Sequence, residues 1–406
     1  MSSSQKITPD AGFNRREGFA SFILLAPAVL FLLALFIWPI STYLYRSVDN
    51  SEIANALPNT LDALSVWDGK SEVPDEAFAK LFSDLTLLRQ NQTIGNVARL
   101  MNYREPGFRE MILKAARTSV DRQDSASVRQ ALVGAEPRWQ DLKYWRQIKQ
   151  ASGSFTPFYA LSSIDLNQTD TGEIVRAPAE QRLFIAIYLR TLGISALVTF
   201  FCLVLGYPTA YLLSAASPRS ANLLMLLLMI PFWTSLLVRT ISWVVILQDG
   251  GPVNSFLLWL GIIDQPLHLL YSRFAVVVAM TQVLLPFMVL PLYASMKAVS
   301  PAQVRAAMSL GGGPVFSFRT VYLPQTRPGI SAGCLLVFIL ALGYYITPAV
   351  VGGPADQMLS QYIAFYTNQT INWGLASALS VGLLLISLVL FVAYARVVNI
   401  KNMRLS

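Results

Sequence analysis

The chain has 406 residues, of which 54% are hydrophobic and only 13% are charged, with a formal net charge of +8. Soluble domains carry about 25% charged residues, so this deficit indicates that lipid covers much of the surface. A nucleic-acid-binding protein is disfavoured, because long apolar runs separate the basic residues instead of leaving them in one patch. With one histidine and two cysteines that fall in apolar runs, the sequence predicts no disulfide framework, metal site or catalytic residues.

The first apolar run extends from Phe19 to Tyr45. It is too long for the hydrophobic region of a signal peptide, and no cleavage site follows, so we expect a retained first membrane helix. From residue 49 to residue 183 the chain is rich in charge and almost neutral. Helical spacing of apolar residues, clearest over 77–88, predicts a mainly helical, water-facing domain there.

Five more apolar runs, each about as long as a membrane-spanning helix needs, follow this domain. They cover approximately Tyr188–Leu213, Asn222–Leu247, Phe274–Met296, Gly329–Val351 and Ala376–Tyr394. Together with the first run, they predict six transmembrane helices. Prolines interrupt several of them, and in membrane helices a proline marks either a bend near a pathway or a simple packing kink.

Basic residues are distributed unequally between the two sets of helix ends. One set carries Lys6, Arg15, Arg16, Arg219, Lys297, Arg305, Arg319, Arg327, Arg396, Lys401 and Arg404. The short loops at the opposite ends, 248–273 and 352–375, contain a single Lys or Arg residue, Arg273. Short cytoplasmic loops are the ones enriched in Lys and Arg, so both termini are expected in the cytoplasm and the 49–183 domain outside.

The cytoplasmic loop between the fourth and fifth spans has the pattern of two short helices. Ser300 can cap a helix, Pro301 suits its first turn, and Gln303 lies where a capping box places it. This helix should end at Gly311–Gly313, and Pro314 can begin the second one. The loop is therefore predicted to be a compact helix–turn–helix on the cytoplasmic surface.

This loop resembles the EAA motif of ABC importer permeases, which reads Glu-Ala-Ala, three residues, Gly, nine residues, Ile-x-Leu-Pro. The corresponding positions, with both spacings kept, are Arg305, Ala306, Ala307, Gly311, Val321, Leu323 and Pro324. Only the first residue type departs strongly, since Arg305 stands where the family has glutamate. The resemblance implies that this loop, at about 298–328, docks onto an ATPase subunit, and the departure inverts the charge of one docking contact.

The resemblance covers the first span and the chain from about residue 188 to the C-terminus. Within the family, the chain is most similar to the spermidine/putrescine-type permeases. The supporting stretches are 203–211, 231–239, 285–293, 328–338 and 343–353. It implies the type I importer permease fold in an all-α polytopic inner-membrane protein, with the helical domain inserted between the first two transmembrane helices. It also implies an ATPase dimer that holds ATP and Mg, a second permease and an external solute-binding protein as partners; no cofactor is expected on this chain, which has no Walker A pattern.

A translocation pathway is expected to be lined by residues with polar tips inside the spans. The candidates are Trp233, Arg239, Trp243, Gln282, Tyr344, Tyr345 and Thr347. Arg239 is the clearest charge within a span, and no span offers it an acidic partner, so a backbone carbonyl freed by Pro231, a partner permease or a substrate carboxylate remains possible. Aromatic rings suit a cationic amine, but a polyamine also needs carboxylates, which these spans lack.

The sequence thus divides into a first transmembrane segment (1–48), an inserted domain (49–183) and a five-helix core (184–406). The favoured hypothesis is a permease subunit of an ATP-driven importer for a polyamine-like solute, with an amino-acid-like or other small organic solute as the alternative. The alternative of another class is a membrane-anchored sensor that binds a ligand through 49–183. That sensor would need a large cytoplasmic output domain, and only short loops and tails lie on the predicted cytoplasmic side.

Overall fold

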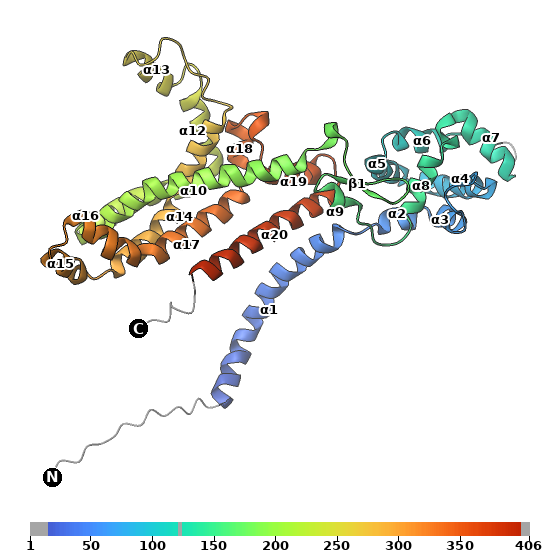
Figure 1. Cartoon of the computed structure of the whole chain (residues 1–406). Coiled ribbons are helices and arrows are strands. Elements are labelled where there is room, and N and C mark those ends of the chain that lie inside the picture. The colour runs from blue at the N-terminus through green and yellow to red at the C-terminus, as the bar shows by residue number, and fades with distance from the viewer. Residues whose placement is uncertain (1–14, 121–123, 399–406) are drawn as a thin grey trace.

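The computed structural model describes residues 15–120 and 124–398, and most of them are helical (Figure 1). The longer helices of the membrane part are α1 (Arg15–Arg46), α10 (Phe184–Ala215), α11 (Pro218–Trp233), α12 (Leu236–Leu247), α14 (Arg273–Ala298), α17 (Leu323–Leu342) and α20 (Trp373–Val398). The shorter elements are α13 (Pro252–Trp259), α15 (Pro301–Ser309), α16 (Pro314–Ser317), the π-helix η3 (Phe318–Tyr322), α18 (Ile346–Val351), the 3₁₀ turn η4 (Pro354–Asp356) and α19 (Leu359–Asn368).

Five of the expected spans coincide with helices that are long and apolar enough to cross a membrane. Among the described residues these are Leu25–Arg46, Phe184–Ala215, Arg273–Ala298, Pro314–Leu342 and Trp373–Arg396. The side chains of the first one are largely exposed, as expected for a surface that faces lipid.

The expected third span, Asn222–Leu247, is not a single straight helix. The chain forms α11 and then a second helical stretch, and the two are bent by 95° at a break of residues 234–235. Pro231 lies inside α11 and removes one N–H from its ladder, while Thr234 at the end of α11 takes an extended backbone. Thr234 donates from both its backbone N–H and its hydroxyl to the Pro231 carbonyl, which satisfies the broken end of the helix.

The fifth predicted span, Gly329–Val351, also ends earlier than expected. Helix α17 stops at Leu342, and α18 begins only after three intervening residues. Gly343 follows the last residue of α17, and glycine is a frequent residue at a helix end. The residues on both sides of this break are apolar, so the average hydropathy of the sequence does not show where the helix ends.

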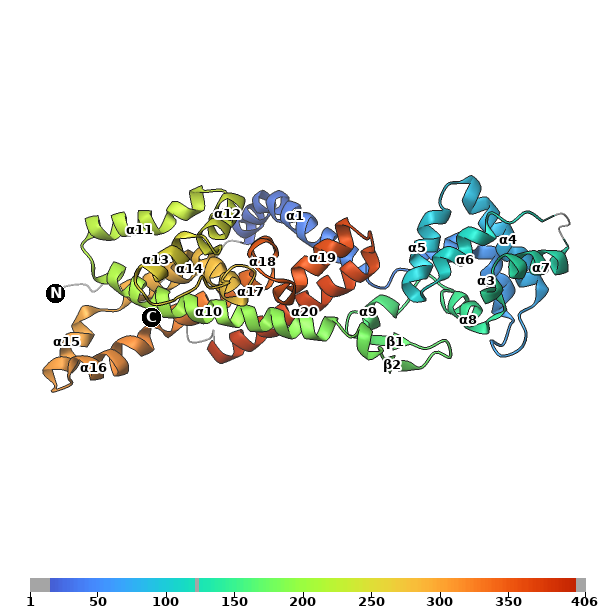
Figure 2. The ribbon, with the colours of Figure 1, turned by 90° about the horizontal axis from the view of Figure 1, so that it is seen from above.

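Helices α10, α14 and α17 pack side by side and form the centre of the membrane part (Figures 1 and 2). Met288 of α14 lies between two glycines: a Cβ atom on Gly206 of α10 would be 2.9 Å from its Cγ, and one on Gly333 of α17 would be 2.7 Å from its Sδ. Small residues allow close approach of membrane helices, so these two glycines bring α10 and α17 onto α14.

The inserted domain is mainly helical, as predicted. It contains α2 (Ser51–Ala56), α3 (Pro58–Ser65), α4 (Asp75–Gln90), α5 (Ile94–Arg104), α6 (Phe108–Ala115), α7 (Ser125–Ala135), η1 (Pro137–Gln140), α8 (Leu142–Gln150), α9 (Phe158–Ser162), the antiparallel strands β1 (Leu166–Gln168) and β2 (Ile174–Arg176), and η2 (Ala179–Gln181). Its own core is built around the fully buried rings of Phe78, Phe108, Trp139 and Trp145. These residues therefore have a hydrophobic core of their own.

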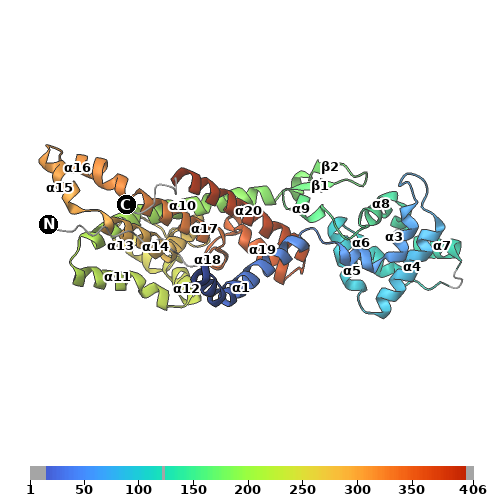
Figure 3. The same ribbon diagram turned by 90° about the horizontal axis from the view of Figure 1, so that it is seen from below.

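Several contacts join the inserted domain to the membrane helices. The carboxylate of Asp165 accepts hydrogen bonds from the backbone N–H groups of the first residues of α10, at 2.9 Å from Phe184 and 2.8 Å from Ile185. The Tyr159 ring fills the space beside Gly374 on α20, where an added Cβ would come within 2.4 Å of it. The domain lies at the end of the helix bundle opposite α15 and α16 (Figures 1–3).

Candidate coupling loop and translocation pathway

The predicted coupling loop is a helix–turn–helix, as expected. Helix α15 ends at Ser309, and the backbone N–H groups of Gly311 and Gly312 donate to the carbonyls of Met308 and Ala307, at 3.1 Å in each case. This pair of bonds is the Schellman arrangement, and it needs a residue in the left-handed region, which Gly311 supplies with φ of +90°. Gly312 is needed for space, because a Cβ there would be 2.8 Å from the Ala307 carbonyl oxygen.

The start of the first helix differs from the prediction in one respect. Ser300 occupies the N-cap position, but its hydroxyl makes no capping hydrogen bond, and the contact to Gln303 is a 3.2 Å bond between backbone atoms. Pro301 at the first helical position lacks an N–H, so one of the donors at this helix end does not exist.

The structure divides the residues of the motif into two groups. Arg305, Ala306 and Gly311 are exposed, and Ala307 is half-buried beside them. Val321, Leu323 and Pro324 lie at the base of the loop, half-buried where η3 continues into α17. The first group is thus available to a partner, whereas the second joins the loop to the membrane helices.

An exposed apolar surface surrounds the turn, and the motif positions do not include it. We call it the loop patch; its members, with their exposed fractions, are Met308 (43%), Leu310 (89%), Val315 (66%) and Phe316 (60%). Exposed apolar side chains gathered at one place usually mark an interaction surface. In the sequence, these four residues could have been recognised as apolar side chains that flank the glycines of the turn on both sides.

An aromatic cluster joins the base of the loop to α10. We define this base cluster as Tyr207, Tyr211, Phe318 and Tyr322. The Phe318 ring stacks on Tyr322 with 5.6 Å between centroids, and both rings meet Tyr211 edge-on, at 6.1 and 5.5 Å. The Tyr207 hydroxyl also lies 3.1 Å from the hydroxyl of Thr326 on α17. Packed rings and one hydroxyl contact therefore connect the base of the loop to α10 and α17.

Helices α12, α14 and α18 bring together three of the predicted pathway residues: Trp243, Gln282 and Thr347. The indole N–H of Trp243 on α12 donates a 2.7 Å hydrogen bond to the side-chain oxygen of Gln282 on α14. The hydroxyl of Thr347 on α18 lies 3.2 Å from that of Thr240 on α12. Thr347 and Thr240 are both buried, and Trp243 and Gln282 are half-buried.

Arg239 does not lie in the middle of a continuous span, as the sequence suggested, but in the first turn of α12. Its guanidinium donates a 3.1 Å hydrogen bond to the carbonyl of Thr234 at the helix break, and its Nε finds no partner among the described residues. The partner is therefore a backbone carbonyl, although not one that Pro231 frees, because a proline in a helix frees the carbonyl four residues earlier, here that of Leu227.

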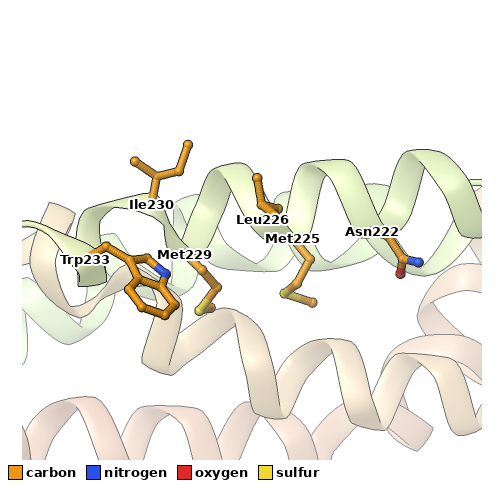
Figure 4. Close-up of a pocket in the computed structure, with 6 residues that line it drawn as sticks. All are labelled: Asn222, Met225, Leu226, Met229, Ile230 and Trp233. Atoms are coloured by element: carbon orange, nitrogen blue, oxygen red, sulfur yellow. The ribbon is translucent and has the colours of Figure 1, made fainter.

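The remaining predicted residues are less closely associated with this group. Tyr344 is half-buried and its carbonyl accepts a 2.7 Å bond from Ser360, while Tyr345 is 44% exposed. Trp233 is 90% exposed at the end of α11. It lies with Met225, Met229 and Ile230 along an open groove of about 540 Å³ (Figure 4).

Within the described ranges, no group of three or more His, Cys, Asp and Glu side chains could hold a metal ion. The chain's histidine, His268, pairs instead with Asp249, at 2.9 Å between Nδ1 and Oδ2.

Comparisons with known proteins find relatives of this chain, although no family model matches it. The spermidine/putrescine transport system permease protein PotB of Salmonella typhimurium is 34% identical over 224 residues, which cover 55% of this chain and 78% of that protein. PotB of Haemophilus influenzae is 36% identical over 213 residues, covering 52% and 74%. The chain belongs to the ABC importer permeases.

A further relative is the inner membrane ABC transporter permease protein YdcU of Escherichia coli, 32% identical over 182 residues that cover 41% of this permease and 58% of YdcU. Among solved structures, a bacterial alginate ABC transporter in complex with an alginate pentasaccharide-bound periplasmic protein matches at 18% identity with a TM-score of 0.44, covering 52% of the permease and 77% of that chain. Family membership makes the protein a multi-pass membrane transport subunit and not an enzyme, which sets aside the sensor hypothesis.

Proposed function

We propose that this permease forms half of the translocation pathway of an ATP-driven importer, and that a separate ATPase moves it through the α15–α16 loop. The observation that carries the proposal is the exposed face of this loop, with Arg305, Gly311 and the loop patch, held on α10 and α17 by the base cluster. ATP and Mg belong to the ATPase in this proposal, because neither the Walker A pattern nor a metal-binding group occurs in the described part of this chain.

We propose an ATPase dimer, a second permease and an external solute-binding protein as partners, with lipid around the spans. The second permease would complete the pathway on the side of Trp233 and Leu237, which are 90% and 56% exposed. Coupling by such an assembly requires that ATP binding moves the loops and exposes the solute site first to one side and then to the other.

The orientation that we propose has both termini in the cytoplasm and residues 49–183 outside as a separate inserted domain. Two observations support it: the basic residues gather at one set of helix ends, and the α15–α16 loop lies at the opposite end of the bundle from the domain (Figure 3). In this orientation the external solute-binding protein would meet the domain and the outer ends of the spans.

The proposed solute is polyamine-like, on the basis of the two relatives named spermidine/putrescine permeases. Trp243 and Gln282, with Thr240 and Thr347, are the proposed pathway residues, and Arg239 is proposed to brace the helix break. An amino-acid-like solute is the alternative that Arg239 favours, since a cation repels a polyamine and attracts a carboxylate.

Mild-detergent purification of the tagged chain from native membranes tests the assembly. We expect an ATPase and a second permease to co-purify, and uptake of labelled spermidine by vesicles that contain the complex. Arg305→Glu should weaken ATPase recovery because it reverses a charge on the exposed loop, whereas Arg219→Glu, also exposed, should not.

Two outcomes would contradict parts of this proposal. Recovery of the chain without any ATPase would overturn the importer assembly. Recovery of the complete complex with ATP-dependent uptake of an amino acid but not of spermidine would overturn only the polyamine assignment.

A further inference from the structure

A cavity of about 770 Å³ lies where the inserted domain meets the membrane part, a size typical of small-molecule sites. We call it the junction cavity. Helices α5, α8 and α9 and the hairpin β1–β2 line one side, and Phe184 of α10, Tyr366 of α19 and the start of α20 line the other. It is thus far from the coupling loop, at the opposite end of the bundle (Figures 1 and 2).

Nearly buried polar side chains line this cavity with hydrogen-bonding atoms left over. Gln147, Tyr159 and Asn372 are 7%, 5% and 2% exposed. Neither the Gln147 amide nor the Tyr159 hydroxyl bonds to another described residue, and Asn372 uses only its Oδ1, which accepts from the backbone of Leu375. Because these residues line the cavity, their free atoms can bond to a molecule within it.

Every carboxylate in the lining is already engaged. Glu105 pairs with Lys143 at 2.6 Å, and Asp170 pairs with Arg146. Asp165 accepts three backbone N–H bonds at the start of α10. Each lining carboxylate therefore already has a donor within the protein.

Two of the three basic residues in the lining, Arg104 and Arg176, form no ion pair with a described residue, whereas Lys143 pairs with Glu105. Arg104 donates to Asn50 at 2.8 Å and to Thr156 at 3.1 Å, both neutral, and its Nε has no partner among the described residues. Burial lowers the pKa of Arg104 below its usual value, since no carboxylate offsets the desolvation. Arg176 on β2 is exposed at the cavity and makes no ion pair with a described residue.

We propose that the junction cavity binds a small organic solute that carries a carboxylate group, at a site separate from the translocation pathway. Arg104 and Arg176 would receive the carboxylate, and the Gln147 amide, the Tyr159 hydroxyl and the Asn372 amide would bond the other polar atoms. The ligand would contact the inserted domain and α20 at the same time, so it would hold the two together. The proposal does not depend on which solute the permease transports.

The test uses three solutes with the same four-carbon length and different charge, which are succinate, 4-aminobutyrate and putrescine. Each is titrated calorimetrically into the full chain in lipid nanodiscs. We expect succinate and 4-aminobutyrate to bind in the cavity, and we expect any binding of putrescine to be unchanged by the cavity variants Arg176→Gln and Tyr159→Phe. Putrescine binding that those variants weaken, or no binding of succinate and 4-aminobutyrate, would overturn the proposal.

Matched variants separate the cavity from the rest of the domain. Arg176→Gln and Tyr159→Phe should each weaken succinate binding about tenfold, as expected for the loss of one charge-assisted hydrogen bond. Arg109→Gln and Tyr144→Phe make the same chemical changes away from the cavity and should leave binding unchanged. Equal loss in both pairs, or no loss in Arg176→Gln and Tyr159→Phe, would contradict the assignment of the cavity.

Discussion

The Tyr211 ring on α10 lies edge-on to the Tyr322 ring of η3, with 5.5 Å between the centroids and 87° between the planes. The same Tyr322 ring stacks on Phe318 and places its hydroxyl 3.4 Å from that of Ser214. One side chain thus joins the base of the coupling loop to the end of a membrane helix. The proposed transmission of movement from the ATPase to α10 would pass through this side chain.

Tyr322→Ala should therefore separate loop movement from helix movement. Loss of the ring contacts removes about 0.5–1.5 kcal/mol for each aromatic pair. We expect the complex to assemble and hydrolyse ATP while solute uptake falls at least about tenfold, and we expect Tyr322→Phe to retain uptake. Measuring ATPase activity and uptake on the same preparation checks this, and a parallel loss of both would contradict it.

Gly311 and Gly313 provide a matched test of the turn. Gly311 has φ of +90°, whereas Gly313 has φ of −65° and open space where a Cβ would be. Alanine in the left-handed region costs about 1–2 kcal/mol, so Gly311→Ala should distort the turn and weaken ATPase binding. Gly313→Ala should have no effect on recovery of the ATPase. If the two variants recover the ATPase equally, the turn geometry is not part of the docking surface.

The bond between Trp243 and Gln282 predicts the effect of an apolar substitution. Gln282→Leu leaves the indole N–H of Trp243 without its acceptor, at a cost of about 1–3 kcal/mol if the donor remains buried. We expect a lower thermal unfolding temperature in detergent and reduced uptake, and Gln282→Glu should restore the acceptor. Unchanged uptake and unchanged unfolding in Gln282→Leu would remove this pair from the pathway.

Glu136 in the inserted domain predicts a pH dependence. Hydrogen bonds and ion pairs with Arg138 and Lys114 lower the pKa of this buried carboxyl to about 2, from an ordinary value near 4.5. A lowered pKa in the folded state stabilises the fold above the unfolded-state pKa, and the stabilisation is lost as pH falls through the folded pKa. The contribution is therefore complete above about pH 4.5 and declines toward pH 2.

The comparison that isolates this contribution is between the natural chain and Glu136→Gln. The variant should unfold at a lower temperature at pH 7, and the difference should shrink between pH 4.5 and pH 2. Tryptophan fluorescence follows the unfolding, because Trp139 and Trp145 lie in the core of the domain. A difference that is the same at all pH values would show that the carboxylate charge is not its source.

The sequence by itself determined the membrane class, the position of five spans, the helical inserted domain and the helix–turn–helix loop. Each of these depends on a local property: the average hydropathy of a window, the spacing of apolar residues, or the order of Pro and Gly at helix ends. The Schellman turn at Gly311 and Gly312 is of this kind, since its bonds join residues close in the chain.

Only the tertiary structure decided the features that depend on direction or on distant contacts. The 95° bend after Trp233 changes no average hydropathy, yet it moves Arg239 to the start of a helix. Asp165 caps α10, and Tyr159 enters the space at Gly374, because the inserted domain folds back onto helices that follow it in the sequence. The junction cavity is formed by these long-range contacts, and no local pattern encodes a cavity between elements that are distant in the chain.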